Sequence, residues 1–247
     1  MPKKDPSHIG GNSGIGLATV ERFAGAGAKV YSFDLPTAQK VAKNDWTHVP
    51  VDMRDVRALK EATRTVAEEN GRVDVLVANA GKWSGCSLVD VDEALYDDIA
   101  SINIKGTFFA IQSVIPFMRL QKNGGAIVVV GSDQSLVGKA EQNLYGLTKA
   151  AVLQLAKSCA VEFAPENIRV NCVCPGTIDT PFVKGAVSDF AKKKNQDPNA
   201  LYDWLKTAQP FPRLGHPDEV AALITTVAKI PFLVGATISI DGGYTAQ

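Results

Sequence analysis

Two side chains suited to proton transfer stand four residues apart, within the stretch Asn143–Lys149. They are Tyr145 and Lys149, and Ser132 lies thirteen residues before Tyr145, at the end of a strand-like run. Because residues i and i+4 of a helix share a face, a helix here would project the phenol and the ammonium together. A strand end can present the serine hydroxyl to the same point. A tyrosine beside a cation is a general acid and base for chemistry between alcohols and carbonyls.

A glycine-rich turn near the start of the chain is typical of a dinucleotide-binding site. The turn Gly10-Gly-Asn-Ser-Gly-Ile-Gly16 precedes a helical pattern, so a pyrophosphate could approach backbone N–H groups at a helix N-terminus. Asp34 ends the next apolar run, eighteen residues after Gly16, close to the spacing at which an acid reaches a ribose hydroxyl. A carboxylate there would repel a 2′-phosphate, and no Arg or Lys lies in the turn or just after Asp34. The pattern therefore predicts NAD rather than NADP.

Short β-branched runs alternate with longer helical stretches along the chain. Strands are predicted at Ala28–Phe33, Thr47–Val51, Val73–Ala78, Ala126–Gly131, Ile168–Cys174 and Thr237–Ile240. Helices are predicted between them at Gly14–Gly25, Asp55–Asn70, Asp90–Ile99, Asn103–Gln121, Leu144–Ala164 and Pro217–Lys229. The nearly continuous apolar content of the strands is typical of strands covered on both faces. The alternation predicts an α/β fold of Rossmann type, with a doubly wound, mostly parallel sheet and helices on both faces.

The strand that should precede the glycine turn has a weak composition. The segment Asp5–Ile9 holds one aliphatic residue, a proline, an aspartate and two polar residues, which is unfavourable for a central strand. We therefore expect a first strand that is short, displaced or badly packed. With it, the predicted sheet has seven strands.

A length of 247 residues is common for a single α/β domain, and we interpret residues 1–247 as one NAD-binding domain. The formal net charge is zero, so the balance does not favour nucleic-acid binding. No apolar run is long enough to cross a bilayer, and the N-terminal Met-Pro-Lys-Lys-Asp-Pro run has no apolar signal core behind it. We expect a cytoplasmic protein that does not bind membranes. The four scattered cysteines predict reduced buried thiols, with no metal site.

One region breaks the alternation of strands and helices. The segment 180–214 carries no strand signal and has a polar, mostly helical pattern that includes Trp204. Long insertions in compact domains are more often functional than idle. The segment is therefore predicted to be a lid over the substrate, and a surface excursion without a role is the alternative.

Further motifs follow the turn in a fixed order. The tripeptide Asn79-Ala-Gly81 comes after the fourth strand, and Asn103 lies in Ser101-Ile-Asn103. Near the end of the chain come Pro175-Gly176, then Thr177 and Thr180, and last Asp241-Gly-Gly243. In order and spacing, these motifs and the glycine turn resemble the short-chain dehydrogenase/reductase family in its single-domain form. The resemblance covers nearly the whole chain.

The resemblance implies a catalytic tetrad of Asn103, Ser132, Tyr145 and Lys149, in which Asn103 anchors a water that links Lys149 to solvent. It also implies that Asp52 meets the exocyclic amine of adenine, and that the protein is a homotetramer built partly on the helices 103–121 and 144–164. Together with the turn and its spacing, it gives one cofactor-binding set: Gly10, Asn12, Ser13, Gly14, Ile15, Gly16, Asp34, Asp52, Met53, Asn79, Ala80, Gly81, Tyr145, Lys149, Pro175, Gly176, Thr177, Ile178 and Thr180.

The residues suggest a mechanism. A free tyrosine has a pKa of about 10, and an adjacent cation can lower it by about one to three units. Lys149 and an oxidised nicotinamide are expected to supply that positive charge. Tyr145 would then remove a hydroxyl proton while a hydride passes to NAD, with Ser132 holding the reacting oxygen and Lys149 the nicotinamide ribose.

The residues expected around the substrate are mostly polar, which favours a small polar secondary alcohol such as a sugar, sugar acid or hydroxy acid. Lys82 or Lys139 could pair a substrate carboxylate. One alternative is an NADPH-dependent 3-oxoacyl-thioester reductase, which Asp34 argues against. Another is a non-catalytic nucleotide-binding scaffold, which the intact Ser132, Tyr145 and Lys149 argue against. The polar set is Lys82, Trp83, Asp133, Gln134, Ser135, Glu141, Gln142 and Asn143.

Overall fold

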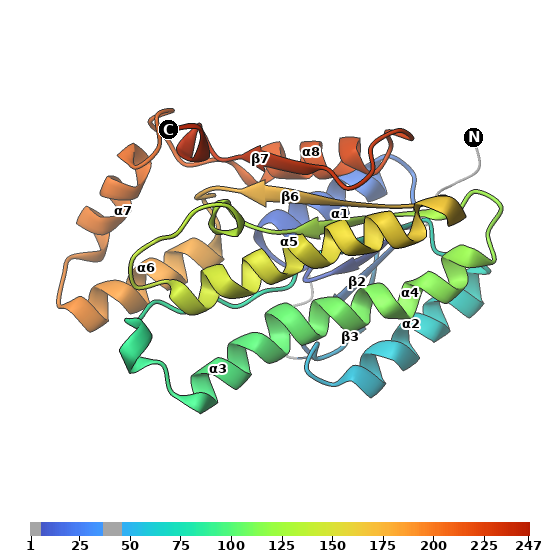
Figure 1. The fold of residues 1–247 in the computed structure, drawn as a ribbon, viewed down its shortest axis with the longest axis horizontal. Coiled ribbons are helices and arrows are strands. Elements are labelled where there is room, and N and C mark those ends of the chain that lie inside the picture. Colours follow the sequence, from blue (N-terminus) through green and yellow to red (C-terminus); the bar gives the residue numbers. More distant parts are fainter. Residues whose placement is uncertain (1–5, 37–45) are drawn as a thin grey trace.

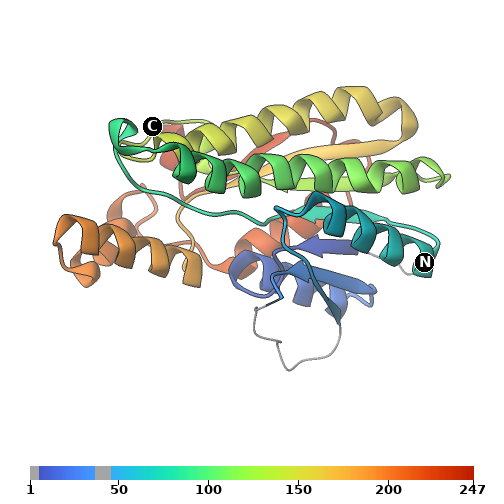
Figure 2. The same cartoon turned by 90° about the horizontal axis from the view of Figure 1, so that it is seen from below.

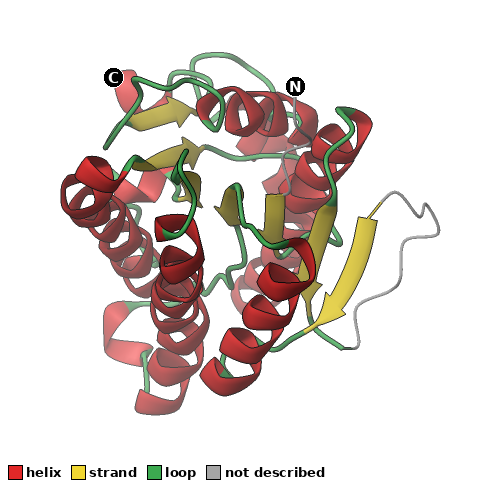
Figure 3. Cartoon of the chain, turned by 90° about the vertical axis from the view of Figure 1, so that its right-hand side faces the viewer, coloured by secondary structure: helices red, strands yellow, loops and turns green. Residues whose placement is uncertain are grey.

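A parallel sheet organises the chain, and the computed structural model describes residues 6–36 and 46–247. Within these residues, seven strands lie in the order β3-β2-β1-β4-β5-β6-β7, and each pairs with its neighbours in parallel (Figure 3). The predicted doubly wound parallel sheet is confirmed. The order reverses between β1 and β4, the place where such folds bind ligands at the carboxyl ends of the strands. The strands are β1 (Pro6–Ile9), β2 (Val30–Asp34), β3 (Trp46–Pro50), β4 (Val75–Ala78), β5 (Gly125–Val130), β6 (Ile168–Pro175) and β7 (Thr237–Ile240).

Helices cover both faces of this sheet (Figures 1 and 2). On one face lie α2 (Val56–Asn70), α4 (Thr107–Arg119) and α5 (Asn143–Phe163), and on the other lie α1 (Gly14–Gly25) and α8 (Pro217–Val227). Beyond the carboxyl ends of the strands, α6 (Pro181–Lys194) and α7 (Pro198–Thr207) form the projecting end of the molecule.

The alternating side chains of the central strands build a separate core on each face. On β4, Leu76 joins the core under α2, α4 and α5, whereas Val75 and Val77 join the core under α1 and α8. β5 repeats the pattern, with Ile127 on the first side and Val128 on the second. Because both faces are buried, these strands carry continuous apolar runs. That is why their sequence signal was strong.

The first strand is short, as its composition predicts. It spans four residues, Pro6–Ile9, and still pairs with β2 on one side and β4 on the other. Pro6 is its first residue, where a missing N–H costs the ladder least. Asp5, the first residue of the predicted segment, lies outside the described residues.

The two helices predicted at Asp90–Ile99 and Asn103–Gln121 are one continuous helical run. α3 (Glu93–Ala100) passes through a π-helical segment, Ser101–Gly106, directly into α4. A π-helical segment inside an α-helix often marks a functional position, and this one contains Asn103. In the described part of the chain, no helix is both long and apolar enough to cross a membrane.

Candidate active site

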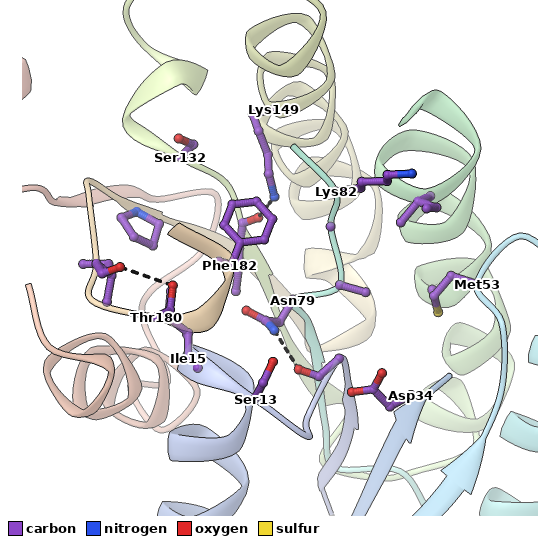
Figure 4. A pocket seen from close by; sticks show the side chains of 18 of the residues that line it. Ser13, Ile15, Asp34, Met53, Asn79, Lys82, Ser132, Lys149, Thr180 and Phe182 are labelled. Atoms are coloured by element: carbon purple, nitrogen blue, oxygen red, sulfur yellow. Dashed lines mark hydrogen bonds between the residues drawn. The ribbon is translucent and has the colours of Figure 1, made fainter. Parts of the chain in front are cut away.

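A cavity of about 500 Å³ opens at the carboxyl ends of the strands, where the order reverses. Figure 4 shows Asp34 and Met53 at one end, Ser132 and Lys149 at the other, and Asn79 between them. The cavity thus joins the two groups of residues that the sequence singled out. Of the predicted cofactor set, these line it: Gly10, Ser13, Gly14, Ile15, Asp34, Asp52, Met53, Asn79, Ala80, Gly81, Tyr145, Lys149, Pro175, Gly176, Ile178 and Thr180.

The turn between β1 and α1 forms the floor of the cavity. Gly10 and Gly14 have φ angles of 74° and 51°, a region that favours glycine. The amide of Asn79 donates a hydrogen bond to the carbonyl oxygen of Gly10 at 2.9 Å, which ties the turn to the end of β4. Ser13 is the N-cap residue of α1, but its side chain makes no capping hydrogen bond. The first N–H groups of the helix therefore face the cavity without a partner from Ser13. This is a suitable cradle for a pyrophosphate.

Gly16 lies beside this turn and does not line the cavity. A Cβ atom built there would stand 1.8 Å from the carbonyl oxygen of Gly10 and 2.8 Å from Nδ2 of Asn79. Its lack of a side chain lets α1 approach the turn. The glycine therefore shapes the cradle without touching its contents.

We expect Gly16→Ala to lower the melting temperature and to weaken NAD binding by at least tenfold, because the new methyl group must displace the Gly10 carbonyl at a cost of about 1–3 kcal/mol. Gly25→Ala is the matched control, since Gly25 is the last residue of the same helix and has nothing within 4 Å of its Cβ position. Thermal melting and NAD titration of both variants measure the effect. Equal NAD affinity in the two variants would contradict this role of Gly16.

The end of the cavity at which adenosine is predicted carries two carboxylates, Asp34 and Asp52. Oδ2 of Asp34 accepts from the backbone N–H of Asn12 at 3.0 Å, and Oδ1 accepts from that of Leu35 at 2.8 Å. Asn12 does not line the cavity, because its side chain is bonded to Ser32 and His48. It fixes the turn against β2 and β3, and its backbone orients the Asp34 carboxylate.

Arg54 also lines this end and was not identified from the sequence. Its guanidinium donates hydrogen bonds to both oxygens of the Asp52 carboxylate: Nη2 lies 2.6 Å from Oδ2, and Nε lies 3.0 Å from Oδ1. These hydrogen bonds lower the pKa of Asp52. Arg54 also reaches Asp98, at 3.4 Å. The carboxylate predicted to meet adenine is thus already engaged by Arg54, which follows it by only two residues.

The other end brings Ser132, Tyr145 and Lys149 together. All three are buried and line the cavity. Tyr145 and Lys149 lie one turn apart on α5, with Nζ of Lys149 5.8 Å from the centroid of the Tyr145 ring. Ser132 follows β5 and begins a 3₁₀ turn, Asp133–Ser135, where its hydroxyl is fixed next to the phenol.

The electrostatic balance at Tyr145 differs from the prediction. Burial raises the pKa of Tyr145 above its ordinary value, the charge of Asp133 raises it further, and a hydrogen bond with Ser132 acts in the opposite direction. The ammonium of Lys149 donates to the carbonyl oxygen of Val130 at 2.8 Å. Burial lowers the pKa of Lys149 itself to about 8. Desolvation thus dominates the pKa of Tyr145 here. The predicted lowering also includes the positive charge of an oxidised nicotinamide, so it stays a prediction.

Asn103 lies behind the cavity wall rather than in it. Its Nδ2 donates to the carbonyl oxygen of Lys82 and to Oγ1 of Thr148, both at 2.9 Å, and its Oδ1 accepts from the backbone N–H of Lys82 at 2.7 Å. A Cβ atom at Gly81 would lie between Oδ1 of Asn103 and Nζ of Lys149, at 3.5 and 3.4 Å. The side chain thus holds the 81–82 loop against α5, close to Lys149.

The segment after β6 supplies the remaining wall. Thr180 caps α6 through its hydroxyl, which accepts from the N–H of Val183 at 3.3 Å. Thr177 does not line the main cavity: its carbonyl accepts from the N–H of Gly215, and it borders a second, smaller pocket of about 100 Å³. Phe182 was missed from the sequence, yet its ring centroid lies 6.4 Å from that of Tyr145. Lys82, predicted for the substrate pocket, also lines the cavity. Other lining residues that were not predicted are Phe33, Leu35, Val51, Ile102, Val130, Gly131 and Val183.

Known proteins resemble this chain over nearly its whole length. A short-chain dehydrogenase family model, described as enoyl-(acyl carrier protein) reductase, matches residues 9–245. The chain belongs to the short-chain dehydrogenase/reductase family. It is 34% identical to an L-rhamnose 1-dehydrogenase (NAD(P)(+)) of Azotobacter vinelandii, over 95% of this chain and 93% of that protein. It is 35% identical to a 3-oxoacyl-[acyl-carrier-protein] reductase of Thermotoga maritima, over 95% and 94%.

Structures of the family agree with the fold. A short-chain dehydrogenase family protein from Francisella tularensis superposes with a TM-score of 0.90 at 28% identity, covering 99% of this chain and all of the other. The protein is therefore a short-chain dehydrogenase/reductase, an oxidoreductase that acts on CH–OH groups with a nicotinamide dinucleotide. The cavity fits that cofactor in one further respect: the glycine turn and Ser132, Tyr145 and Lys149 all line the same cavity.

Proposed function

We propose that this short-chain dehydrogenase/reductase transfers a hydride between NAD and a small polar secondary alcohol or its ketone, with a sugar as the favoured substrate. One observation carries the proposal: a single cavity has Asp34 at one end and Ser132, Tyr145 and Lys149 at the other. Asp34 selects NAD over NADP, and Ser132, Tyr145 and Lys149 carry out the proton transfer.

In the proposed mechanism Tyr145 is the general base for alcohol oxidation and the general acid for ketone reduction. Ser132 hydrogen-bonds the reacting oxygen and holds it against the phenol. Lys149 would hold the nicotinamide ribose, and Asn103 holds the loop beside it. When bound, the nicotinamide supplies the hydride acceptor and, in its oxidised form, a positive charge that favours the phenolate.

The two lysines that were candidates for a substrate carboxylate are both engaged. Nζ of Lys82 lies 2.5 Å from Oδ2 of Asp98, and Nζ of Lys139 lies 2.7 Å from Oδ2 of Asp133. Binding a sugar acid or a hydroxy acid through either lysine would require breaking an ion pair. This favours a neutral sugar over the two acids, and the similarity to an L-rhamnose 1-dehydrogenase supports the same choice.

The second candidate is an NADPH-dependent 3-oxoacyl-thioester reductase. It is favoured by the similarity to the Thermotoga maritima reductase. Asp34 argues against it, because its carboxylate is fixed at the adenosine end and would repel a 2′-phosphate. A non-catalytic scaffold, the third candidate, would not need the buried Ser132, Tyr145 and Lys149.

A screen of nicotinamide absorbance tests the proposal and separates the three candidates. Purified protein is mixed with NAD or NADP and a panel of neutral sugars, sugar acids, hydroxy acids and small diols, and a 3-oxoacyl thioester is tested with NADH and NADPH. We expect NAD reduction with at least one neutral sugar. Turnover only of the thioester with NADPH would favour the second candidate, and no turnover with any pair would favour the scaffold.

We propose that α6 and α7, within the segment 180–214, close over the substrate. Three contacts support this role. The start of α6 places Phe182 against Tyr145, Nζ of Lys193 donates to the carbonyl oxygen of Gly85 at 3.1 Å, and Lys194 pairs with Glu141. The end of the helix thus contacts the loop after β4 and the loop before α5. Protection of α6 from hydrogen exchange should increase when NAD and substrate are both present, and unchanged protection would argue against a lid.

We also propose that the protein is a cytoplasmic homotetramer. Exposed apolar side chains on α4 and α5 support self-association, among them Phe108, Leu147 and Val161, which is 81% exposed. Light scattering should give a mass of four chains, and a monomer would exclude this assembly.

A further inference from the structure

Ser132 is followed by a buried carboxylate whose two oxygens are both engaged. Asp133 is 3% exposed. Its Oδ1 accepts the hydroxyl proton of Ser132 at 2.8 Å, and its Oδ2 accepts from Nζ of Lys139 at 2.7 Å. Burying a carboxylate is costly unless it is paired and hydrogen-bonded. The two hydrogen bonds offset this cost and place the carboxylate next to the active-site serine.

The carboxylate fixes the orientation of Ser132. The serine hydroxyl donates its one proton to Asp133, and its oxygen accepts from the backbone N–H of Gln134 at 3.2 Å. A hydroxyl has one proton and two lone pairs. Ser132 thus presents a lone pair to the cavity, which accepts a hydrogen bond from a substrate alcohol. To donate to the Tyr145 phenolate or to a ketone oxygen, its hydroxyl must turn away from Asp133.

Lys139 is the counter-ion of this carboxylate. Its side chain is 18% exposed, and its ammonium lies 4.2 Å from the centroid of the Tyr244 ring, so the C-terminal segment shields the pair from water. In a shielded site, removal of one charge of a pair exposes its neighbours to the other charge. Two titrating groups neighbour the pair: Tyr244, whose ring contacts Lys139, and Tyr145, whose phenol is hydrogen-bonded to Ser132.

We propose that Asp133 is the positioning residue for Ser132, that Lys139 holds Asp133 in place, and that the two charges together set the pH at which Tyr145 gives and takes its proton. This inference rests on the proposed function, in which Tyr145 is the acid and base. It adds two residues to the four that the family resemblance supplied.

Other charges near Tyr145 are engaged elsewhere. Lys149, on the same helix, donates to the carbonyl oxygen of Val130. On the 81–82 loop, Lys82 pairs with Asp98, and Glu141 pairs with Lys194 of α6. Phe182, the α6 residue packed against the phenol, is uncharged. Asp133 is the charge that raises the pKa of Tyr145, in addition to burial.

Alcohol oxidation needs the Tyr145 phenolate. Removing the charge of Asp133 and removing the charge of Lys139 are therefore expected to shift its pH dependence in opposite directions. Asp133→Asn removes the negative charge but keeps an acceptor for Ser132, so the rising limb of the rate profile should move to lower pH by about one pH unit. Lys139→Met leaves Asp133 unopposed, so the limb should move to higher pH by about the same amount. A residue that merely supported the fold would lower the rate without moving the limb.

The experiment compares the unaltered chain with Asp133→Asn, Asp133→Ala, Lys139→Met and Lys139→Arg. For each, kcat and KM are measured against pH with the best sugar from the screen. A substrate-free readout accompanies them: the pH at which phenolate absorbance appears in NAD-saturated protein, taken as the difference from the same chain carrying Tyr145→Phe. Thermal melting identifies variants that are not folded.

We expect opposite shifts in Asp133→Asn and Lys139→Met, an unshifted limb in Lys139→Arg, and a fall in kcat of about 10- to 100-fold in Asp133→Ala, where Ser132 loses its acceptor. Limbs that stay in place, or move in the same direction in both charge variants, would overturn the inference. If one charge variant does not fold, the direction of shift in the other decides. Failure of the proposed function is distinct from this, because the unaltered chain would then oxidise no alcohol at all.

Discussion

Replacing Tyr145 with phenylalanine is expected to reduce hydride transfer by about a thousandfold while leaving NAD binding nearly unchanged. The substitution removes only the phenolic oxygen of a buried ring that packs near Phe182, so the cavity keeps its shape. A positioned acid or base contributes about 10²- to 10⁴-fold to a rate, and no other hydroxyl of the triad is placed to replace it, because Ser132 already donates to Asp133. Steady-state rates and NAD titration measure the two effects.

The matched control for this substitution is Tyr96→Phe. Tyr96 lies on α3, where it is 44% exposed. It loses the same atom without touching the cavity, and its rate should equal that of the unaltered protein. Rates that fall equally in the two variants, or that fall in neither, would remove Tyr145 from the chemistry.

Replacing Asp34 with asparagine is expected to move cofactor preference toward NADP by about a hundredfold in the ratio of kcat/KM values. The carboxylate is held at the end of β2 by the N–H groups of Asn12 and Leu35, so it cannot turn away from a 2′-phosphate. Asparagine has the size of aspartate but no charge. The repulsion that it removes, between the Asp34 carboxylate and a 2′-phosphate, costs several kcal/mol at most. NAD should bind more weakly as well, because a charged acceptor for the ribose is lost.

Glu69→Gln provides the control for a general loss of negative charge. Glu69 is exposed near the end of α2, away from the cavity-lining residues, and its removal should leave the ratio unchanged. An Asp34→Asn protein that still rejects NADP as strongly as before would mean that something else excludes the phosphate. Arg54 would then have to be examined, since it lines the same end while paired with Asp52.

Much of the fold could be predicted because both kinds of element carried a clear pattern. The helix Gly14–Gly25 and the strand Thr237–Ile240 have the predicted bounds, and the central strands were recognised from their continuous apolar runs. The join between α3 and α4 could not be predicted. It depends on a π-helical segment whose Asn103 is bonded to Lys82 and Thr148, contacts that arise only in the folded chain.

The site, like the fold, has local features that could be predicted and features that arise only in the folded chain. Spacing on one helix predicted that Tyr145 and Lys149 would lie together, because that relation is local. Charge balance was not local. Burial and the charge of Asp133 raise the pKa of Tyr145, and both depend on how β5 meets α5 in the folded chain. Arg54 and Phe182 followed recognised motifs by one or two residues, so a wider view of strand ends would have found them.

The most direct measurement of the central claim follows a labelled hydrogen. A sugar that carries deuterium on the carbon to be oxidised is incubated with the protein and NAD, and the reduced nicotinamide is analysed for deuterium. If the alcohol at Ser132 and Tyr145 passes its hydride to a nicotinamide in this cavity, the label appears on C4 of the ring, and it does not appear with Tyr145→Phe. Reduced nicotinamide without deuterium, or equal labelling by the phenylalanine variant, would contradict the account.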